Sequence, residues 1–487
     1  MNRAIILLTT MFLWVVALPV QQSQAKKRSR PHILLIVADD LGYNDVGFHS
    51  GAKNSPTPVI DKLAKNGVEL TNFYVHPLCS PTRAAMLTGR HPIRYGMQFE
   101  VIRPWMENGL SLNEFLLPQA LKRANYKSVI IGKWHLGHSE KYQPFRRGFD
   151  HQYGPHKGAI NYYSKERGGE VDWFRNGKQV KNEKSYATNL LGKEAVKIIQ
   201  EHNKKQPLFM YLPFNAVHVP LQGPPKHKKP KLKKIKGEGK KAYKERLDKE
   251  TFRWMLKNLD TNIGRILAAL KERKMRKNTL VFFISDNGGH KGISDNSPFR
   301  GNKGSFYEGG IRVVSIVNWP AQLKAGKRDQ PMHAVDLYPT LLNLVGVDSN
   351  GIKQQLPIDG IDVWPTVARE ATLKRKDLFL NVHRNLGAIR SGRWKLYVKF
   401  ASCKKLEGNT LEQCDKCSKV SGKYAHRKQL FDLSNDPGET KDLAAKKRKV
   451  VARMFKELMT YDAAAKEEVF YCDTTTKTKK KTKKKKK

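Results

Sequence analysis

Four apolar stretches of the sequence end in polar residues that could bind a metal ion or transfer a proton. They read HILLIVADDLG, YKSVIIGKWHLG, PLFMYLPFNAVHVP and TLVFFISDNGG. Their polar residues of interest are Asp39, Asp40, Lys133, His135, His218, Asp286 and Asn287. Each cluster alone could be a turn or a helix cap, because Asp and Asn side chains bond to nearby backbone groups. Four such clusters at the same end of the same kind of segment favour one shared site.

The oxygen atoms of these side chains predict a site for a hard cation. Three carboxylates and the amide oxygen of Asn287 suit Ca²⁺ or Mg²⁺ better than a softer metal. The strand-end clusters contain no group of Cys or His residues with the spacing of a zinc site. We favour Ca²⁺, because it accepts carboxylate and amide oxygens in irregular arrangements.

Cys79 is isolated from the other four cysteines of the chain. Those four lie near the carboxyl terminus and are Cys403, Cys414, Cys417 and Cys472. Cys79 opens the stretch CSPTRAAMLTGR, in which Pro81 suits the first turn of a helix and Gly89 suits its end. At a helix amino terminus, free N–H groups and the helix dipole favour negative charge. Arg83 falls on the same helical face, so we expect an anionic species at Cys79 that faces Arg83 and the cation.

Segments with helical periodicity separate the apolar stretches and indicate how the polar residues are positioned. They span residues 55–68, 116–126, 187–202 and 250–274. Apolar strands that alternate with amphipathic helices indicate an α/β fold with a largely parallel sheet covered on both faces. Ligands of such sheets bind outside the carboxyl ends of the strands. We therefore expect the polar residues to converge at one edge of the sheet.

The length and the charge of the chain set further bounds. A chain of 487 residues exceeds what one hydrophobic core usually supports, so we expect a large domain with a smaller companion. The formal net charge is +47, and Lys residues are concentrated at 225–246 and 477–487. Such a charge attracts polyanions, and for a secreted chain we expect sulfated polysaccharide rather than nucleic acid. The alternative is that both basic segments are solvated, disordered and without a specific partner.

A secretory leader is predicted for residues 1–25. Arg3 precedes an apolar run at 4–20, and Ser23 and Ala25 suit a signal-peptidase cut. The alternative is a retained membrane anchor, but the run is short for a spanning helix, so we expect no stable membrane insertion. Export implies an oxidising compartment, where the four late cysteines could pair in any of three ways and leave the isolated cysteine unpaired.

The stretch CSPTRAAMLTGR resembles the sulfatase signature, Cys-x-Pro-x-Arg followed by Thr-Gly-Arg. Similar stretches continue in family order over roughly residues 31–445, among them GKWHLGH, RRGFDHQYG and SDNGG. GYNDVGFH, YLPFNAVHVPLQ and RGNKGSFYEGGIR resemble most the arylsulfatase B group, the N-acetylgalactosamine-4-sulfatases. The resemblance implies an alkaline-phosphatase-like fold, with a large, mixed, mostly parallel sheet sandwiched by helices. It also implies a smaller C-terminal α+β domain that carries an antiparallel sheet.

The resemblance implies a role for each candidate residue. It implies that a formylglycine-generating or sulfatase-maturing enzyme converts Cys79 to formylglycine (3-oxoalanine), an aldehyde whose hydrate is the nucleophile. The implied ligands of one Ca²⁺ ion are Asp39, Asp40, Cys79, Asp286 and Asn287. The implied catalytic residues are Cys79, Arg83, Lys133, His135, His218 and Lys303.

The resemblance also implies how these catalytic residues divide the work. Arg83 and Lys133 would hold the hydrate in its reactive form. His135 would take the proton of the second hydroxyl, which releases the sulfate and restores the aldehyde. His218 and Lys303 would bind the substrate sulfate, with His218 as the general acid for the departing alcohol. A serine at the nucleophile position would lack the second hydroxyl, which explains the use of an aldehyde.

The predicted organisation is a leader at 1–25, a catalytic domain at 26–370, a smaller domain at 371–472 and a disordered Lys-rich tail at 473–487. The basic insertion at 225–246 and the tail depart from the family pattern, and a polyanionic substrate would explain them. The chain has no Asn-x-Ser/Thr sequon, which favours a secreted or periplasmic protein over a lysosomal one.

Two alternatives to a secreted sulfatase acting on sulfated sugars stay open at this point. One is a phosphodiesterase or phosphonate hydrolase that uses the same formylglycine. The other is an inactive homologue that binds polyanions. His383, in NVHRNLGAIR, could reach the substrate pocket or could be structural.

Overall fold

The structure is a computed structural model. It describes residues 30–51, 56–98, 100–228, 231–233, 235–349, 351–352, 356–375, 377–383, 386–400 and 425–463. All of these except Arg30 belong to one compact unit that begins at Pro31. Three predicted features lie outside the described residues: the leader, the Lys-rich tail and the pairing of the four late cysteines. What the sequence indicates for them stays a prediction. Among the described helices, none combines the length and the apolar character that a membrane crossing needs.

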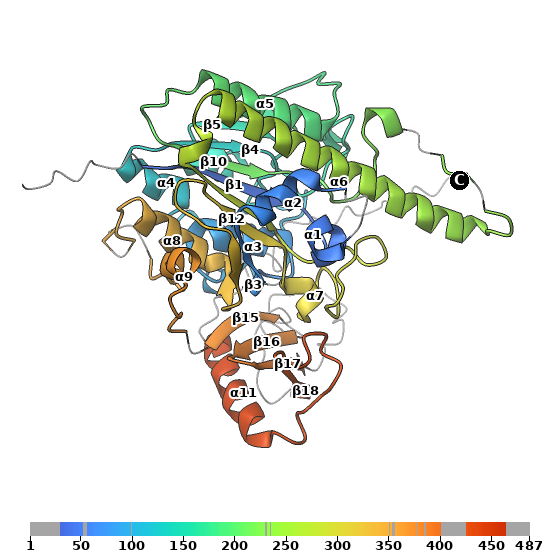
Figure 1. Cartoon of the computed structure of the whole chain (residues 1–487), viewed down its shortest axis with the longest axis vertical. Coiled ribbons are helices and arrows are strands. Elements are labelled where there is room, and N and C mark those ends of the chain that lie inside the picture. The colour runs from blue at the N-terminus through green and yellow to red at the C-terminus, as the bar shows by residue number, and fades with distance from the viewer. Residues whose placement is uncertain are drawn as a thin grey trace, which may run out of the picture. The chain divides into compact units, whose positions relative to one another are not determined.

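A ten-stranded sheet organises the larger part of the chain (Figure 1). The strand order is β13-β2-β12-β11-β1-β10-β4-β5-β8-β9. Its parallel centre consists of β11 (Thr279–Ser285), β1 (His32–Ala38), β10 (Leu208–Pro213), β4 (Lys127–Ile131) and β5 (His151–Gly154). The outer strands are β12 (Ser315–Asn318), β2 (Val68–Leu70), β13 (Gly326–Arg328), β8 (Phe174–Arg175) and β9 (Lys178–Gln179). The predicted mixed, mostly parallel sheet is confirmed, and the four stretches with polar ends are neighbouring parallel strands.

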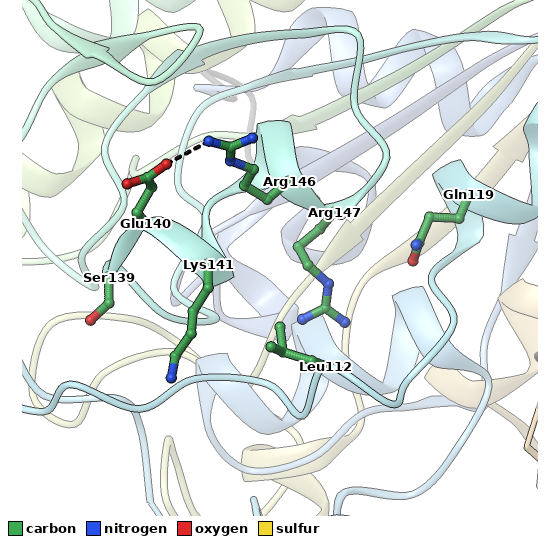
Figure 2. Close-up of a pocket in the computed structure, with 7 residues that line it drawn as sticks. All are labelled: Leu112, Gln119, Ser139, Glu140, Lys141, Arg146 and Arg147. Carbon is green, nitrogen blue, oxygen red and sulfur yellow. Dashed lines mark hydrogen bonds and ion pairs between the residues drawn. The ribbon is translucent and has the colours of Figure 1, made fainter.

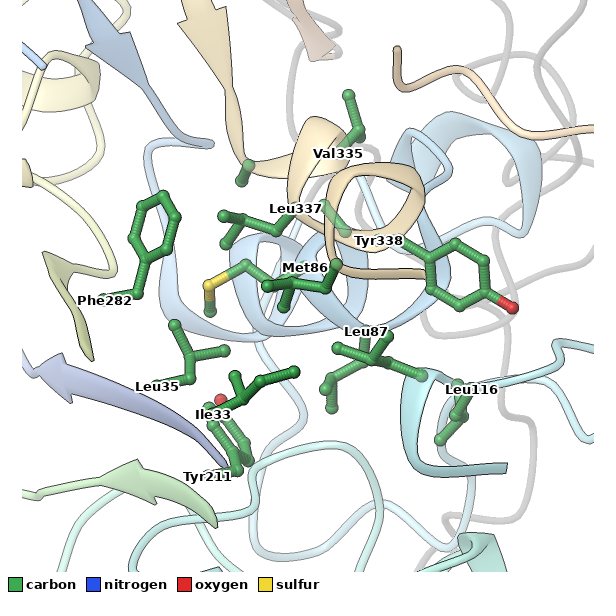
Figure 3. Close-up of a cluster of buried hydrophobic side chains, with 14 of the residues drawn as sticks. Ile33, Leu35, Met86, Leu87, Leu116, Tyr211, Phe282, Val335, Leu337 and Tyr338 are labelled. Atoms are coloured by element: carbon green, nitrogen blue, oxygen red, sulfur yellow. The ribbon is translucent and has the colours of Figure 1, made fainter. Parts of the chain in front are cut away.

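Helices cover both faces of this sheet, as predicted. Successive side chains of a strand point to opposite faces, and the two resulting groups of apolar side chains of β1 lie in two separate cores. One core includes residues of α3 (Cys79–Thr88), α4 (Leu117–Leu121) and α8 (Leu337–Leu344). Figure 3 shows Met86 and Leu87 of α3 between strand residues and α8. The other core includes residues of α2 (Pro58–Lys65), α5 (Ala187–Glu201) and α6 (Lys240–Glu272).

The basic insertion is not wholly without structure. The helix α6 begins at Lys240, ten residues before the predicted start at residue 250, so the last part of the insertion is helical. The buried residues of α6 begin only at Thr251, so its first turns contribute little to the core. The alternative of a disordered segment therefore does not hold for residues 240–246.

A second, four-stranded antiparallel sheet follows in the chain, as predicted. It consists of β15 (Asp377–His383), β16 (Leu386–Ser391), β17 (Trp394–Phe400) and β18 (Ala425–Asp432), and α11 (Arg448–Ala463) packs on it. Lys395 of this sheet donates a buried hydrogen bond of 2.8 Å to Glu308. The predicted domain boundary near residue 370 stays a prediction. The remaining elements are α1 (Gly47–Ser50), α7 (Glu308–Ile311), α9 (Trp364–Arg369), β3 (Phe73–Tyr74), β14 (Met332–His333), β6 (Glu166–Arg167) and β7 (Glu170–Val171).

Candidate active site

Cys79 is the first residue of α3, where the sequence placed it. The helix ends at Gly89, whose φ of 70° is a left-handed conformation that glycine adopts without strain. A Cβ at this position would also lie 2.9 Å from Cβ of Tyr338. Cys79 is buried and lies below the carboxyl ends of the parallel strands. The predicted helix with its cysteine at the amino terminus is therefore present.

The polar strand ends meet at the sulfur atom of Cys79. Its Sγ lies 3.3 Å from Oδ1 of Asn287, 3.5 Å from Oδ1 of Asp39 and 3.5 Å from Nζ of Lys303. Asp39 follows β1 and Asn287 follows β11, two neighbouring parallel strands. The predicted convergence of these residues is confirmed.

Each of the three carboxylates of the site lies beside a different cation, and a terminal nitrogen of Arg83 also lies 3.8 Å from Asp39. Lys133 Nζ lies 2.7 Å from Asp39, and Lys303 Nζ lies 2.6 Å from Asp40. Arg83 donates from Nε and a terminal nitrogen to one oxygen of Asp286, at 3.0 and 2.7 Å. These groups are buried, so loss of one partner of a pair would leave an uncompensated buried charge. The site therefore contains three carboxylates and three neutralising cations.

The same residues fit a divalent cation. Ligand atoms of Asp39, Asp40, Cys79 and His218 all lie within 4.8 Å of one another. Oδ2 of Asp40 is buried and has no hydrogen-bond partner among the described residues. Burial and then the neighbouring Asp286 raise the pKa of Asp39 to about 7, and a cation bound here would favour its ionised form.

This group of His, Cys and carboxylate ligand atoms shares Asp39, Asp40 and Cys79 with the predicted ligand set. It adds His218 and lacks Asp286, and the amide of Asn287 is of a different ligand type. One oxygen of Asp286 accepts the two bonds from Arg83, and the other accepts the backbone N–H of Asp40 at 3.3 Å. Asn287 donates from its amide nitrogen to Asp40 at 2.8 Å and directs its oxygen to Cys79.

The thiol of Cys79 is held in its neutral form. Burial and then the charge of Asp286 raise its pKa above the usual range, although Lys133 and Lys303 oppose this. The helix terminus does not lower the pKa of the thiol as its dipole alone would suggest. Burial opposes the charge of Lys303, but Cys79 and Asp40 raise the pKa of that amine, which stays cationic.

His135 is positioned as a neutral base. Its Nε2 donates to the carbonyl of Ile102 at 3.0 Å, and Nδ1 is buried without a partner among the described residues. Burial and then Lys133 hold its pKa well below the usual range. Its φ of 59° is rare outside glycine. A bond of 2.8 Å from Ser80 to its carbonyl fixes it against α3.

His218 is also neutral in this structure. Its Nδ1 donates to the carbonyl of Val219 at 2.6 Å, and its Nε2 lies 3.6 Å from Oδ2 of Asp40. Burial lowers the pKa of His218 to about 3, although Asp40 opposes this. His218 therefore needs a proton before it can act as a general acid.

Several residues at the site were not singled out from the sequence. The hydroxyl of Tyr162 donates to the carbonyls of Asn215 and His218, at 2.7 and 2.9 Å. The side-chain amide of Asn215 is buried without a partner among the described residues. Gly158 is also at the site, because a Cβ there would overlap the ring of His135. Asn215 lies in the stretch PLFMYLPFNAVHVP and could have been found, but Tyr162 and Gly158 have no local signal.

His383 is the last residue of β15, and both alternatives for it stay predictions.

A hollow of about 620 Å³ lies elsewhere on the surface (Figure 2). It is lined by Leu112, Gln119, Ser139, Glu140, Lys141, Arg146 and Arg147. Arg146 pairs with Glu140 at 2.5 Å, and Arg147 donates to backbone carbonyls. This hollow contains none of the candidate catalytic residues, and its arginines are already paired.

The α/β fold brings carboxylates, cations and one cysteine together in a buried polar group, and comparisons with known proteins give the family of the chain. Residues 31–347 match the Sulfatase family, and residues 373–486 match the C-terminal region of aryl-sulfatase. Arylsulfatase J of Mus musculus is 30% identical over 474 residues, which cover 90% of this chain and 76% of that protein. N-acetylgalactosamine-6-sulfatase of Mus musculus is 31% identical over 449 residues, which cover 84% and 81%.

A solved structure extends the comparison to three dimensions. The crystal structure of Ps i-CgsB matches with a TM-score of 0.76 and 31% identity, over 92% of this chain and 96% of that one. A second structure of that protein, in complex with k-i-k-neocarrahexaose, matches equally. The chain belongs to the sulfatase family and has its alkaline-phosphatase-like fold. It is a sulfuric ester hydrolase, so the family and the enzyme class predicted from the sequence are confirmed.

Proposed function

We propose that this sulfatase removes sulfate from a sulfated sugar or polysaccharide by means of a formylglycine formed from Cys79. The observation that carries the proposal is the surroundings of Cys79. Its sulfur lies within 3.5 Å of Asp39, Asn287 and Lys303, yet the raised pKa keeps the thiol neutral. A neutral thiol is a weak nucleophile, and the oxygen ligands around it select a metal that binds sulfur poorly. An oxygen nucleophile at position 79 suits both the charges and the ligands.

Asp39, Asp40 and the amide oxygen of Asn287 would hold a Ca²⁺ ion next to residue 79, with Asp286 and the modified residue as the remaining predicted ligands. When bound, the ion would stabilise negative charge on the sulfuryl oxygens. The unpartnered oxygen of Asp40 and the raised pKa of Asp39 support a cation at this position. Ca²⁺ is proposed over Mg²⁺ because it accepts carboxylate and amide oxygens in irregular arrangements.

The cationic and basic side chains divide the remaining work. Lys303 carries a firm positive charge beside residue 79 and would bind the substrate sulfate. Arg83 and Lys133 neutralise Asp286 and Asp39 and would hold the nucleophile in its reactive form. The free Nδ1 of His135 would accept a proton from the hydroxyl at residue 79 when sulfate is released.

His218 would protonate the departing alcohol. The pKa of about 3 is too low for this role, so the pKa must rise when substrate binds. The negative charge of a sulfate ester next to the imidazole would raise it, because opposite charge stabilises the protonated ring. Lys303, which is firmly protonated, would contribute as a cation rather than as a proton donor.

The substrate is proposed to be a sulfated sugar, in a polymer that is itself anionic. Relatives include an N-acetylgalactosamine-6-sulfatase and a protein solved with a neocarrahexaose, and the sequence motifs resemble the 4-sulfatases. The start of the basic insertion supports a polymer. Lys228 lies 4.5 Å from the ring centre of Tyr163, and His227 stacks on Trp254 at 4.1 Å. Tyr163 is next to Tyr162, whose hydroxyl donates to the backbone carbonyl of His218. The insertion therefore begins close to the candidate active site.

The test combines chemistry at residue 79 with a substrate comparison. The full chain is produced in a host that exports it and supplies a maturing enzyme, and the peptide that contains Cys79 is analysed by mass spectrometry. We expect formylglycine at residue 79, and release of sulfate from N-acetylgalactosamine 4-sulfate or 6-sulfate. This activity should be lost in Cys79→Ala. In the wild-type chain it should be lost after chelation and restored by Ca²⁺.

Other outcomes would contradict particular parts of the proposal. Faster release of phosphate than of sulfate from matched aryl esters would favour the phosphodiesterase alternative. An unmodified thiol together with full activity in Cys79→Ala would exclude the formylglycine. Binding of sulfated polymer without any turnover would indicate an inactive homologue. Detection of the mature protein outside the cytoplasm, cut after residue 25, would test export and the leader.

A further inference from the structure

Three buried histidines form a cluster apart from the candidate active site. His76 follows β3, His91 precedes a 3₁₀ turn at Pro92–Arg94, and His333 is the last residue of β14. One ring nitrogen of each lies within 4.8 Å of the other two. The ring centroids are 4.9, 5.0 and 5.6 Å apart. We call these three residues the histidine cluster.

The nitrogens of the histidine cluster are largely without partners. Both ring nitrogens of His76, Nδ1 of His91 and Nε2 of His333 are buried and have no hydrogen bond among the described residues. His76 faces the backbone of Leu380 but without a bond of normal geometry. Leaving a buried polar atom unpaired is unfavourable, and one such atom in a structure needs an explanation. Three such rings, each with one nitrogen in the same small space, indicate a ligand.

The protonation of the cluster suits a metal ion rather than an anion. Burial, followed by the neighbouring imidazoles, lowers the pKa of His76 and His333 well below the usual range, and burial lowers that of His91 to about 4. All three rings are therefore neutral at pH 7. Neutral imidazole is the form that coordinates metals, whereas an anion would need protonated rings.

We propose that the histidine cluster binds a borderline divalent metal ion, best fitted by Zn²⁺, through one nitrogen of each ring. Imidazole nitrogen suits zinc, whereas the oxygen donors around Cys79 suit Ca²⁺, so the chain would hold two chemically different metals. Zinc–nitrogen bonds are roughly 2.0–2.1 Å long, so the rings must turn inward from their present separations. A water molecule completes four-coordination.

His333 must change its tautomer to take part. Its Nδ1 accepts the backbone N–H of Val335 at 3.3 Å, so the neutral ring carries its proton on Nε2. Coordination through Nε2 moves that proton to Nδ1 and gives up the bond to Val335. This bond is long, so its loss opposes metal binding only weakly.

The site would stabilise the segments that flank α3. His76 lies three residues before Cys79, and His91 lies just after the end of that helix. Phe379 of the second sheet contacts the ring of His91 edge-on at 4.9 Å. A metal held by the histidine cluster would therefore fix both ends of the helix that carries the nucleophile. It is a structural site, because none of its residues is part of the candidate catalytic group.

The test uses the full folded chain, freed of metal with a chelator and then supplied with excess Ca²⁺ to fill the oxygen site. Titration with Zn²⁺ is expected to load one ion per chain and to raise Tm. Titration with Co²⁺ is expected to give the visible absorption of a tetrahedral nitrogen site. His333→Gln should weaken loading by at least about tenfold. His227→Gln, outside the cluster, should load like the wild type.

Two results would overturn the proposal. One is that the wild-type chain, folded by circular dichroism, takes up neither metal with any change in Tm. The other is that His333→Gln loads as well as the wild type, which would place the metal elsewhere. Both readouts are independent of sulfatase activity, so failure of the proposed function would not affect them. If His333→Gln does not fold, the Co²⁺ absorption of the wild type alone decides the ligand type.

Discussion

Replacing Gly158 by alanine should disable His135 without touching any charged group. The backbone from Gly132 to His135 pairs with the segment that leads to Gly158, through bonds such as His135 N–H to His156 at 2.9 Å. A Cβ on Gly158 would overlap Nε2 and Cε1 of the His135 ring and would lie 2.9 Å from its Cδ2. Ordinary carbon contacts are roughly 3.5–4.0 Å, so the ring must move by about 1 Å or more.

A movement of this size breaks the bond of 3.0 Å from His135 to Ile102, which fixes the tautomer. Loss of that bond costs about 1 kcal/mol of stability. Misplacement of a catalytic group by about 1 Å lowers kcat by about a hundredfold. We therefore expect Gly158→Ala to be folded, only slightly less stable, and about a hundredfold slower, with KM little changed.

The assay is steady-state hydrolysis of an aryl sulfate, together with urea unfolding. Gly239→Ala is the matched control, because a Cβ there meets nothing within 4 Å and the backbone φ of −72° suits alanine. The control should keep the wild-type kcat. If folded Gly158→Ala has a kcat within about twofold of the wild type, the loop absorbs the methyl group and the position assigned to His135 is wrong.

Two predictions concern the buried charges that connect the second sheet to α7. Lys395 lies between Glu308 and Glu439, at 2.8 and 2.9 Å. Lys395→Met leaves these carboxylates without their shared cation and should lower the free energy of unfolding in urea by about 3–5 kcal/mol. Lys399→Met, at an exposed position further along the same strand, should change it by less than about 0.5 kcal/mol, and equal effects would contradict the role of the pairing. Burial raises the pKa of Glu439 from 4.5 to about 7. Between pH 4.5 and pH 7 the native state therefore binds more protons than the unfolded state, and the stability of the native state falls as pH rises. Glu439→Gln should remove this part of the slope, seen as a smaller difference in unfolding free energy between pH 5 and pH 7; an unchanged slope would show that Glu439 is ionised throughout.

The strand-end residues were predictable from the sequence because their positions follow from one rule. In a parallel sheet, every residue just after a strand reaches the same edge, so Asp39, Asn287 and Lys133 had to meet. The signal for α3 was equally local, since Cys79 and Gly89 mark its two ends. Lys303 does not follow a strand directly, so this rule could not find it, and it was identified by the family resemblance.

Other features depend on packing between distant segments and left no local pattern. Gly158 matters only because its missing Cβ leaves room for a ring more than twenty positions earlier in the chain. The histidine cluster is similar, since the sequence showed no zinc spacing and His333 lies far along the chain from His76. The first turns of α6 were missed because residues 225–246 were interpreted only by their charge, which left order and disorder open, although Lys is a good helix former.

The charge of the site explains why a cation and a substrate anion belong together there. Asp39, Asp40 and Asp286 are balanced by one arginine and two lysines, so the protein groups alone sum to about zero. Transfer of an anionic ester from water to a neutral buried site is unfavourable, because its charge loses hydration without gaining an opposite charge. Addition of a divalent cation makes the site positive by two charges, whereas a sulfate monoester carries one negative charge. The proposed Ca²⁺ therefore bears on substrate affinity, and its removal should raise KM as well as lower kcat.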